Sequence, residues 1–271
     1  MKDLDIDPEE LIEYFSEEKD SPYLYLKVDA EDIDDLVGCV SRAFRQCYVS
    51  DSLLQERADA LEVELQGSEE SRKLEVIKSK LPSAGATMSG DFGEILTYLY
   101  HASAEHPKEL IGPKKWSLKQ DRTKPAPKSD VVLFSLPEWP NASEDDIIYC
   151  SEVKAKATNG ASEPIQSAIT DCEKDRTSRL ADTLIWLRER ALEQHLGSVE
   201  IAHLDRFIGA VDYPEATYQF NAVAVICSSL IENEIKAAPD QADPEYNLLI
   251  ISVPELKKTY TTTFESAEQE L

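Results

Sequence analysis

The chain has 271 residues, 42% of them hydrophobic, which is enough for one large domain or for one enzymatic core with a smaller module attached. Its formal net charge is −25, from 53 acidic against 28 basic side chains. Proteins that bind nucleic acid without a partner usually present a basic surface, so the intrinsic affinity of this chain for DNA or RNA should be weak. A nucleic-acid substrate would need a partner to deliver it, or basic residues gathered near one site.

The first ten residues, MKDLDIDPEE, are acidic where a secretory signal would be basic and then apolar. No later apolar run approaches the roughly 18 residues of a membrane span. We therefore expect a cytoplasmic protein without a membrane partner. The five cysteines form no CxxC pair and no zinc-ligand spacing with the four histidines, which predicts reduced, mostly buried thiols. A catalytic cysteine–histidine pair is an alternative that no local motif supports.

Residues 1–80 are predicted to form an acidic, mainly helical N-terminal module. The segment YLYLKV alternates in the manner of a strand, and residues 31–81 have mostly helical spacing. Leu36, Val40 and Phe44 recur at that spacing and indicate a buried helix face. The acidic remainder is most simply a solvated face. A docking surface for a partner and a mimic of nucleic-acid charge are the alternatives.

A second unit is predicted at 88–271, after the linker-like segment LPSAGATMSG. It should begin with a helix from 91 to 101, on which Glu94 lies off the apolar stripe. Three strand-like segments follow, at 114–122, 129–136 and 146–157. Together they predict a helix followed by a three-stranded β-meander.

The remainder of this unit is predicted to be one long helix and two buried strands. Glu163 and Pro164 should open the helix, which runs to about His195 with a break near Thr177. The strands are expected at 218–229 and 246–253, and a short helix closes the chain. The fold class is therefore α/β.

An acid and a base stand side by side on the third expected strand. Alternate residues of a strand share a face, so Glu152 and Lys154 project the same way. If the neighbouring strand pairs with it, Asp130 reaches the same pocket. Basic residues are also concentrated just before this point, because 108–128 holds seven Lys and Arg against two acids. Lys119 and Lys128 from that run are candidate contacts for a substrate phosphate.

Two carboxylates suit Mg²⁺ or Mn²⁺, which prefer oxygen ligands and keep waters that a phosphate can displace. Asp130 and Glu152 are the expected ligands, and Glu94 could complete the set from the preceding helix. Lys154 would orient or deprotonate an attacking water, or offset the charge that builds on the phosphate. The expected chemistry is metal-dependent hydrolysis of a phosphodiester.

A helix with Glu94, a strand with Asp130, a strand with Glu152-Val153-Lys154 and a long helix resemble the core of the PD-(D/E)xK nucleases over residues 88–255. Ser129 departs from that motif by replacing its proline. Within the superfamily, GDFGEILTYLY, KSDVVLF and YCSEVKAKAT resemble the HamA-type effectors of the Hachiman anti-phage system. The resemblance implies a DNase that a helicase partner holds and controls. It also adds Gln166, because relatives of this core often place substrate contacts on the helix after the ExK strand.

Each candidate residue has a simpler explanation. Asp91 and Glu94 fit a capping box at a helix start, and Asp130 could be an ordinary turn residue before a strand. Glu152 and Lys154 could form the solvated face of an edge strand. Trp116 and Trp186 are more typical of a core than of a surface that stacks bases.

Two other functions compete with a nuclease. The first is a non-catalytic adaptor that keeps a nuclease-like fold for protein docking, although it would not need all four site residues. The second is an inhibitor that mimics DNA. Basic residues interspersed among the acids argue against the second, because they would interrupt a ladder of phosphate-like charges.

Overall fold

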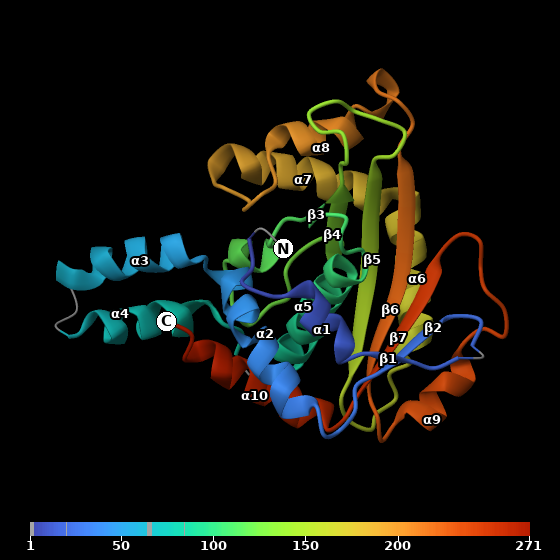
Figure 1. Ribbon diagram of the computed structural model, residues 1–271, viewed down its shortest axis with the longest axis horizontal. Helices are drawn as coiled ribbons and strands as arrows, with labels where there is room; N and C mark the ends of the chain where they lie inside the picture. Colours follow the sequence, from blue (N-terminus) through green and yellow to red (C-terminus); the bar gives the residue numbers. More distant parts are fainter. Residues whose placement is uncertain (1–2, 20, 64–66, 84) are drawn as a thin grey trace.

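In a computed structural model that describes residues 3–19, 21–63, 67–83 and 85–271, the chain folds around one mixed sheet (Figure 1). Within these residues the sheet has seven strands in the order β1-β2-β7-β6-β5-β4-β3. Strands β2, β7, β6 and β5 are parallel neighbours, whereas β1, β4 and β3 pair antiparallel at the two sides. The strands are β1 Ser16–Glu17, β2 Leu24–Lys27, β3 Leu110–Ile111, β4 Val131–Ser135, β5 Ile147–Lys156, β6 Thr217–Cys227 and β7 Asn247–Val253.

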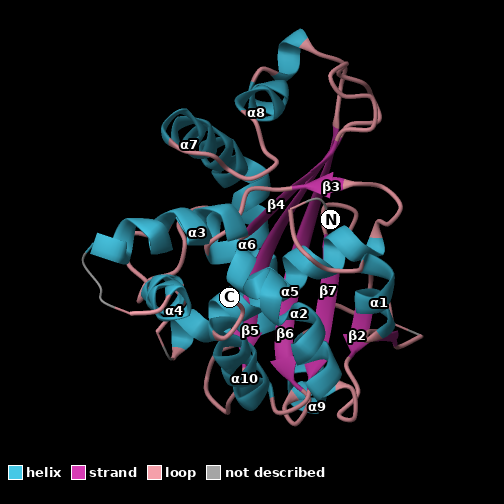
Figure 2. Cartoon of the chain, turned by 60° about the vertical axis from the view of Figure 1, so that its left-hand side comes forward, coloured by secondary structure: helices cyan, strands magenta, loops and turns pink. Residues whose placement is uncertain are grey.

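Helices cover both faces of the sheet, as the two views together show (Figures 1 and 2). Helices α6 and α7 lie on one face, and α5, α2 and α10 lie on the other. Helices α3 and α4 form a hairpin that projects at the left of Figure 1. The helices are α1 Pro8–Glu13, α2 Ile33–Tyr48, α3 Asp51–Ala60, α4 Glu69–Lys80, α5 Ala86–Ala104, α6 Pro164–Lys174, α7 Leu180–Glu193, α8 Ile201–Ile208, α9 Ile231–Glu234 and α10 Leu256–Glu268.

The apolar pattern of the central strands explains why they occupy the middle of the sheet. Strands β4 and β6 are buried along most of their length, as expected for strands covered on both faces. The larger hydrophobic cluster joins the α5 side of the sheet to α2 and α10. A second cluster joins β4 and β5 to α7 and α8 through residues such as Phe134, Leu184 and Phe207. Both faces of β5 are therefore inside the protein.

The predicted long helix and its break are confirmed. Helix α6 begins at Pro164 and α7 ends at Glu193. Between them Asp175–Arg179 forms a π-helical turn, which includes Thr177. A π-helical turn inserts an extra residue into a helix and is frequent at functional sites. Here its last residue, Arg179, contacts Glu152 on β5.

The strand predicted at 114–122 is wrong. The outer strand of the meander is β3, and Lys115–Leu118 forms a short 3-10 turn, η2. Consecutive residues of a strand point to opposite faces, whereas in this turn Lys115 and Trp116 both reach Glu94. Those two inward contacts account for the turn.

The linker predicted at 81–90 is only partly right, because α5 begins at Ala86 and residue 84 lies outside the described residues. The early start places Asp91 and Glu94 in the interior of the helix. The capping-box interpretation of that pair is therefore wrong.

The described part of residues 1–80 is mainly helical, as predicted, and β2 confirms the expected strand. Strand β2 pairs with β7, so this segment extends the same sheet as the rest of the chain. Helix α2 packs on α10, and Arg45 Nε donates to the Glu270 carbonyl at 3.0 Å. The predicted division at residue 80 stays a prediction. Residues 1–2, 20 and 64–66 of the expected module lie outside the described residues.

The five cysteines are free thiols, and all except the partly buried Cys39 are buried, as expected. In the part of the chain that the structure describes, no helix is long and apolar enough to cross a membrane.

Candidate active site

Glu152 and Lys154 lie together on β5, facing α6 and the π-helical turn. Strand β5 is interior, between antiparallel β4 and parallel β6, and Glu152 is 3% exposed. Glu152 Oε1 is 2.5 Å from Lys154 Nζ. The interpretation as a solvated edge-strand face is therefore wrong.

Asp130 precedes β4 and reaches across to β5. The register pairs Val131 with Ser151, which places Asp130 beside Glu152 and Val153. Asp130 Oδ2 accepts a hydrogen bond from the backbone N–H of Val153 at 2.9 Å. This bond holds one oxygen of Asp130 at the backbone of Val153, the residue after Glu152. Asp130 therefore has a role beyond that of an ordinary turn residue before a strand.

Glu94 comes from α5, on the other side of β5. Its neighbour Gly93 allows α5 to pack closely on β5, because a Cβ at position 93 would lie only 3.3 Å from Val153 Cγ1. Glu94 is 5% exposed, and its Oε2 accepts a hydrogen bond from Trp116 Nε1 at 2.9 Å. Trp116 is thus a core residue, as expected, that also holds a candidate ligand.

Lys115 joins Glu94 to Asp130, a contact that is not predicted from the sequence. Its Nζ lies 3.3 Å from Glu94 Oε2 and 3.5 Å from Asp130 Oδ1. It also donates to the Ser129 carbonyl at 2.9 Å. No periodic signal marks Lys115, because its role depends on a 3-10 turn inside a run of basic residues.

A second set of residues, which was not predicted as part of the site, comes from α6 and the π-helical turn. Asp171 Oδ2 lies 2.8 Å from Lys154 Nζ, and Arg179 Nη2 lies 3.2 Å from Glu152 Oε2. Arg179 Nε also donates to Asp175 Oδ1 at 2.6 Å, and that oxygen accepts from Ser129 Oγ at 2.8 Å. The spacing 171, 175, 179 could have revealed this set, because residues four apart share a helix face.

Burial and mutual repulsion shift the carboxyl groups toward their neutral forms. Burial, followed by the nearby Asp130 carboxylate, raises the pKa of Glu152 to about 8. Burial also raises the pKa of Glu94 to about 8, with Lys115 opposing and Asp130 adding to the shift. Burial alone would lower the pKa of Lys154, but Glu152 and Asp171 raise it overall. Perturbed acids and a fixed ammonium in one place are typical of an active site.

The raised pKa of Glu94 predicts how stability depends on pH. The folded protein holds this proton more tightly than the unfolded chain, so stability falls as pH rises from about 4.5 to about 8. Glu94→Gln keeps an acceptor for Trp116 but cannot ionise. In metal-free buffer its unfolding free energy should fall less than that of the wild type over this range. Urea titrations at several pH values check this, and parallel curves for the two proteins would contradict it.

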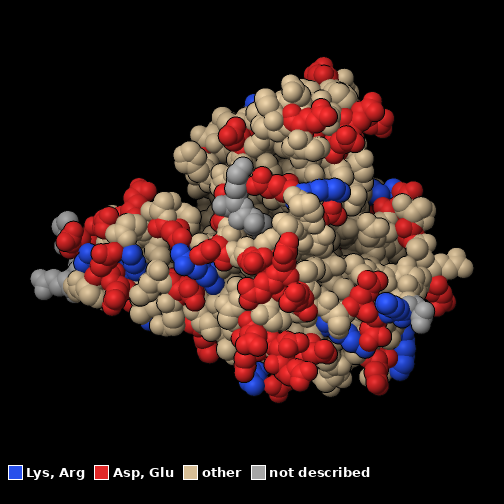
Figure 3. Space-filling model, viewed as in Figure 1, with Lys and Arg blue, Asp and Glu red and all other residues tan. Residues whose placement is uncertain are grey.

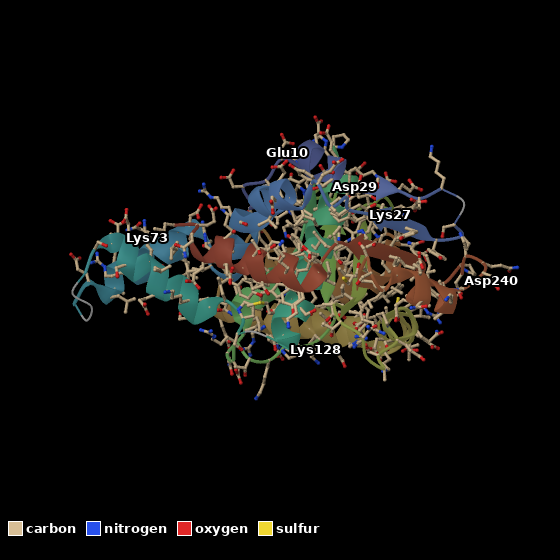
Figure 4. The ribbon with its side chains drawn as sticks, turned by 90° about the horizontal axis from the view of Figure 1, so that it is seen from below. Glu10, Lys27, Asp29, Lys73, Lys128 and Asp240 are labelled. Carbon is tan, nitrogen blue, oxygen red and sulfur yellow. The ribbon has the colours of Figure 1, made fainter. Side chains whose placement is uncertain are left out.

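The three candidate substrate residues are placed differently. Lys119 is buried, with its Nζ 2.6 Å from Asp91 Oδ2, so it is unavailable to a phosphate in this conformation. Lys128 and Gln166 are exposed. In the view of Figure 4, Lys128 lies at the lower edge of the molecule and Glu10 at the upper edge.

The donor chemistry of the site suits a divalent cation, but the ligands are not assembled around one position. Asp130, Glu152 and Glu94 offer only oxygen, and Glu152 Oε2 is buried without a hydrogen bond. Among the described residues, however, no group of three or more His, Cys, Asp or Glu side chains is arranged to hold a metal ion. Each of the three acids instead contacts a cationic side chain.

A comparison with protein families gives a match to HamA over residues 3–267. The chain belongs to the HamA family. HamA is the effector family of the Hachiman system, so the resemblance seen in the sequence is confirmed at that level. The match covers both the N-terminal segment and the β4–β5 site of this HamA family member. No curated protein matches the chain.

Proposed function

We propose that this HamA family member is a metal-dependent DNase that acts as a defence effector in the cytoplasm under the control of a protein partner, with a core of the PD-(D/E)xK type. The observation that carries the proposal is the pair of buried Glu152 and half-buried Lys154 beside Asp130, which precedes the adjacent strand. Two acids and a lysine at one place on a sheet are the groups that phosphodiester hydrolysis needs. Asp130, Glu152 and Glu94 would hold Mg²⁺ or Mn²⁺.

A bound divalent metal supplies Lewis-acid polarisation of the scissile phosphate and lowers the pKa of an attacking water. The raised pKa of Lys154 supports a role as a permanent cation. In that role Lys154 offsets the charge that develops on the phosphate oxygens, and does not remove a proton from water. Asp171, 2.8 Å away, holds its ammonium in place.

Control by a partner is supported by the charge of the molecule. Figure 3 shows acidic side chains outnumbering basic ones over the face that it presents. Such a surface repels phosphate, so we propose that a helicase partner provides most of the affinity of the complex for DNA. Lys128 and Gln166, which are exposed, are proposed as local contacts with the DNA strand.

An exposed apolar surface offers a place for that partner. Of the seven large apolar side chains that are exposed in the described residues, six lie between 185 and 218, including Ile185, Val211 and Tyr218. A groove of about 230 Å³ opens there, lined by α7, α8, β6 and the π-helical turn. Exposed acids, among them Asp182 and Asp212, lie close by in the sequence. Exposed apolar patches mark protein contacts, and these acids favour a partner surface with basic flanks.

Substitutions on this surface should weaken partner binding without unfolding the protein. We expect Ile185→Asp with Val211→Asp to lower the affinity for the helicase by at least about tenfold, because a carboxylate cannot be desolvated in an apolar contact. Calorimetric titration measures this. Leu271→Asp is the matched control, since Leu271 is 48% exposed but lies outside the surface, against 49% for Ile185. If the wild type, the double variant and Leu271→Asp bind the helicase with equal affinity, this surface is not its docking site.

The proposed nuclease is tested by incubating the purified protein with supercoiled plasmid and linear DNA, in Mg²⁺, Mn²⁺ or EDTA. Each reaction is run alone and with any helicase that is encoded beside this protein. Nicking or degradation that requires metal is the expected result. The absence of cleavage in every metal and partner combination would contradict it.

A non-catalytic adaptor is the second candidate. It is favoured by the ion-paired state of the three acids, because pairing of this kind stabilises a fold without any metal. An adaptor would bind the helicase but show no metal-dependent cleavage and no metal-dependent rise in melting temperature.

A further inference from the structure

Lys115 stands where a metal ion would be expected to join Glu94 to Asp130. Its Nζ is within 3.5 Å of an oxygen of each acid, and its side chain is 6% exposed. Burial opposes protonation of Lys115, but Glu94 and Asp130 outweigh it and raise the pKa of this lysine overall. A charged ammonium therefore links the two acids inside the protein.

The other contacts of these acids are fixed by the fold. Trp116 Nε1 holds Glu94, and the backbone N–H of Val153 holds Asp130. Glu152 is engaged separately by Lys154 and Arg179. Among the described residues, Lys115 is thus the one cation that contacts both Glu94 and Asp130.

An ammonium and a divalent metal cannot share this position. Magnesium needs carboxylate oxygens at about 2.0–2.1 Å, whereas the ammonium keeps its two acids 3.3 and 3.5 Å away. Two cations at the same place would also repel each other strongly in a buried site. Metal binding to Glu94 and Asp130 therefore requires the Lys115 side chain to leave.

We propose that Lys115 is a resident cation of the site, and that divalent metal binds Glu94 and Asp130 only when the Lys115 ammonium withdraws. Lys115 thereby weakens the metal affinity of the isolated protein. The proposal rests on the proposed function for the expectation that a metal binds here. The new element is that Lys115 competes with the metal for Glu94 and Asp130. This competition continues until a conformational change displaces the 3-10 turn that carries Lys115.

The turn that carries Lys115 is tied to the rest of the protein on both sides. Lys114, the residue before it, donates from Nζ to the Asp3 carbonyl at 2.7 Å, and Asp3 Oδ2 accepts from the Ser198 N–H at 2.6 Å. Lys119, just after the turn, pairs with Asp91 of α5. A displacement of the N-terminal segment or of the loop at Ser198 would therefore shift the position of Lys115.

The first test measures Mn²⁺ binding to the full chain without DNA, by electron paramagnetic resonance or calorimetry. Lys115→Met should bind Mn²⁺ at least about tenfold more tightly than the wild type, because the competing charge is gone. Lys115→Arg should bind no more tightly than the wild type. Lys156→Met is the matched control, because Lys156 is also 6% exposed and paired with an acid, Glu234, but is not attached to the turn that carries Lys115. Its affinity should not change. Equal or weaker binding by folded Lys115→Met would overturn the proposal.

A second measurement needs only the wild type, which covers the case that Lys115→Met does not fold. Brief reductive methylation, read by mass spectrometry, should label Lys115 several-fold more in saturating Mn²⁺ than in EDTA, while Lys156, buried against Glu234, stays protected. Unchanged labelling of Lys115 despite bound Mn²⁺ would refute withdrawal. If neither the wild type nor any of the variants binds Mn²⁺, the proposed metal chemistry fails as well. If the wild type and all the variants bind Mn²⁺ with the same affinity, only the proposed role of Lys115 fails.

Discussion

Lys154→Met is expected to lower metal-dependent DNA cleavage by at least about 100-fold, which is the usual effect of removing one fixed cation from a developing phosphate charge. The reason is geometric, because Lys154 Nζ is the cation 2.5 Å from Glu152 Oε1. Methionine keeps most of the side-chain volume but has no charge. The plasmid assay in Mn²⁺, with the proposed helicase partner present, measures the change.

Lys174→Met is the matched control. Lys154 and Lys174 both contact Asp171, at 2.8 and 2.6 Å, but Lys174 is 61% exposed, and the described ion pairs of Glu152 are with Lys154 and Arg179. Its substitution should leave cleavage within about twofold of the wild type, as for other surface changes. Comparable losses in both variants would mean that Asp171, and not the charge on Lys154, is what matters. Circular dichroism melting curves verify that each variant is folded.

Arg206→Met should cost about 3–5 kcal/mol of unfolding free energy, the usual effect of removing one partner from a buried ion pair. Arg206 and Asp146 are 1% and 0% exposed, with Nε 2.6 Å from Oδ2. Arg206 Nη2 also donates to the carbonyls of Ser143 and Pro214, at 3.0 and 2.9 Å. The substitution leaves a buried carboxylate without its cation and frees the loops before β5 and β6. Urea unfolding monitored by circular dichroism measures the loss.

The control for Arg206 is Arg188→Met, which removes an exposed ion pair between α7 and Asp205, the neighbour of Arg206 on α8. Exposed pairs contribute little, so its unfolding curve should nearly overlay that of the wild type. A further variant, Arg206→Met with Asp146→Asn, should regain part of the stability because the stranded charge is removed. Equal effects of Arg206→Met and Arg188→Met would show that burial of the pair is unimportant.

The part of the candidate site that could be predicted is the part that local pattern specifies. Strict alternation along β5 is enough to put Glu152 and Lys154 on one face, and apolar flanks identify the neighbouring strand that carries Asp130. The break near Thr177 was also predictable in position, although not as a π-helical turn. Glu94 was placed on the correct helix, but the helix begins five residues earlier than expected.

The amino-acid sequence by itself determined the α/β class, the strands that carry the acid and base, and membership of the HamA family. Only the tertiary structure decided which cations meet those acids. Lys115 lies 21 residues from Glu94 in the chain, Arg179 lies 27 residues from Glu152, and neither distance leaves a periodic trace. Lys119 was expected at the substrate and is instead buried against Asp91. Periodicity reports which face of an element is buried, whereas the pairing of charges depends on how separate elements meet in space.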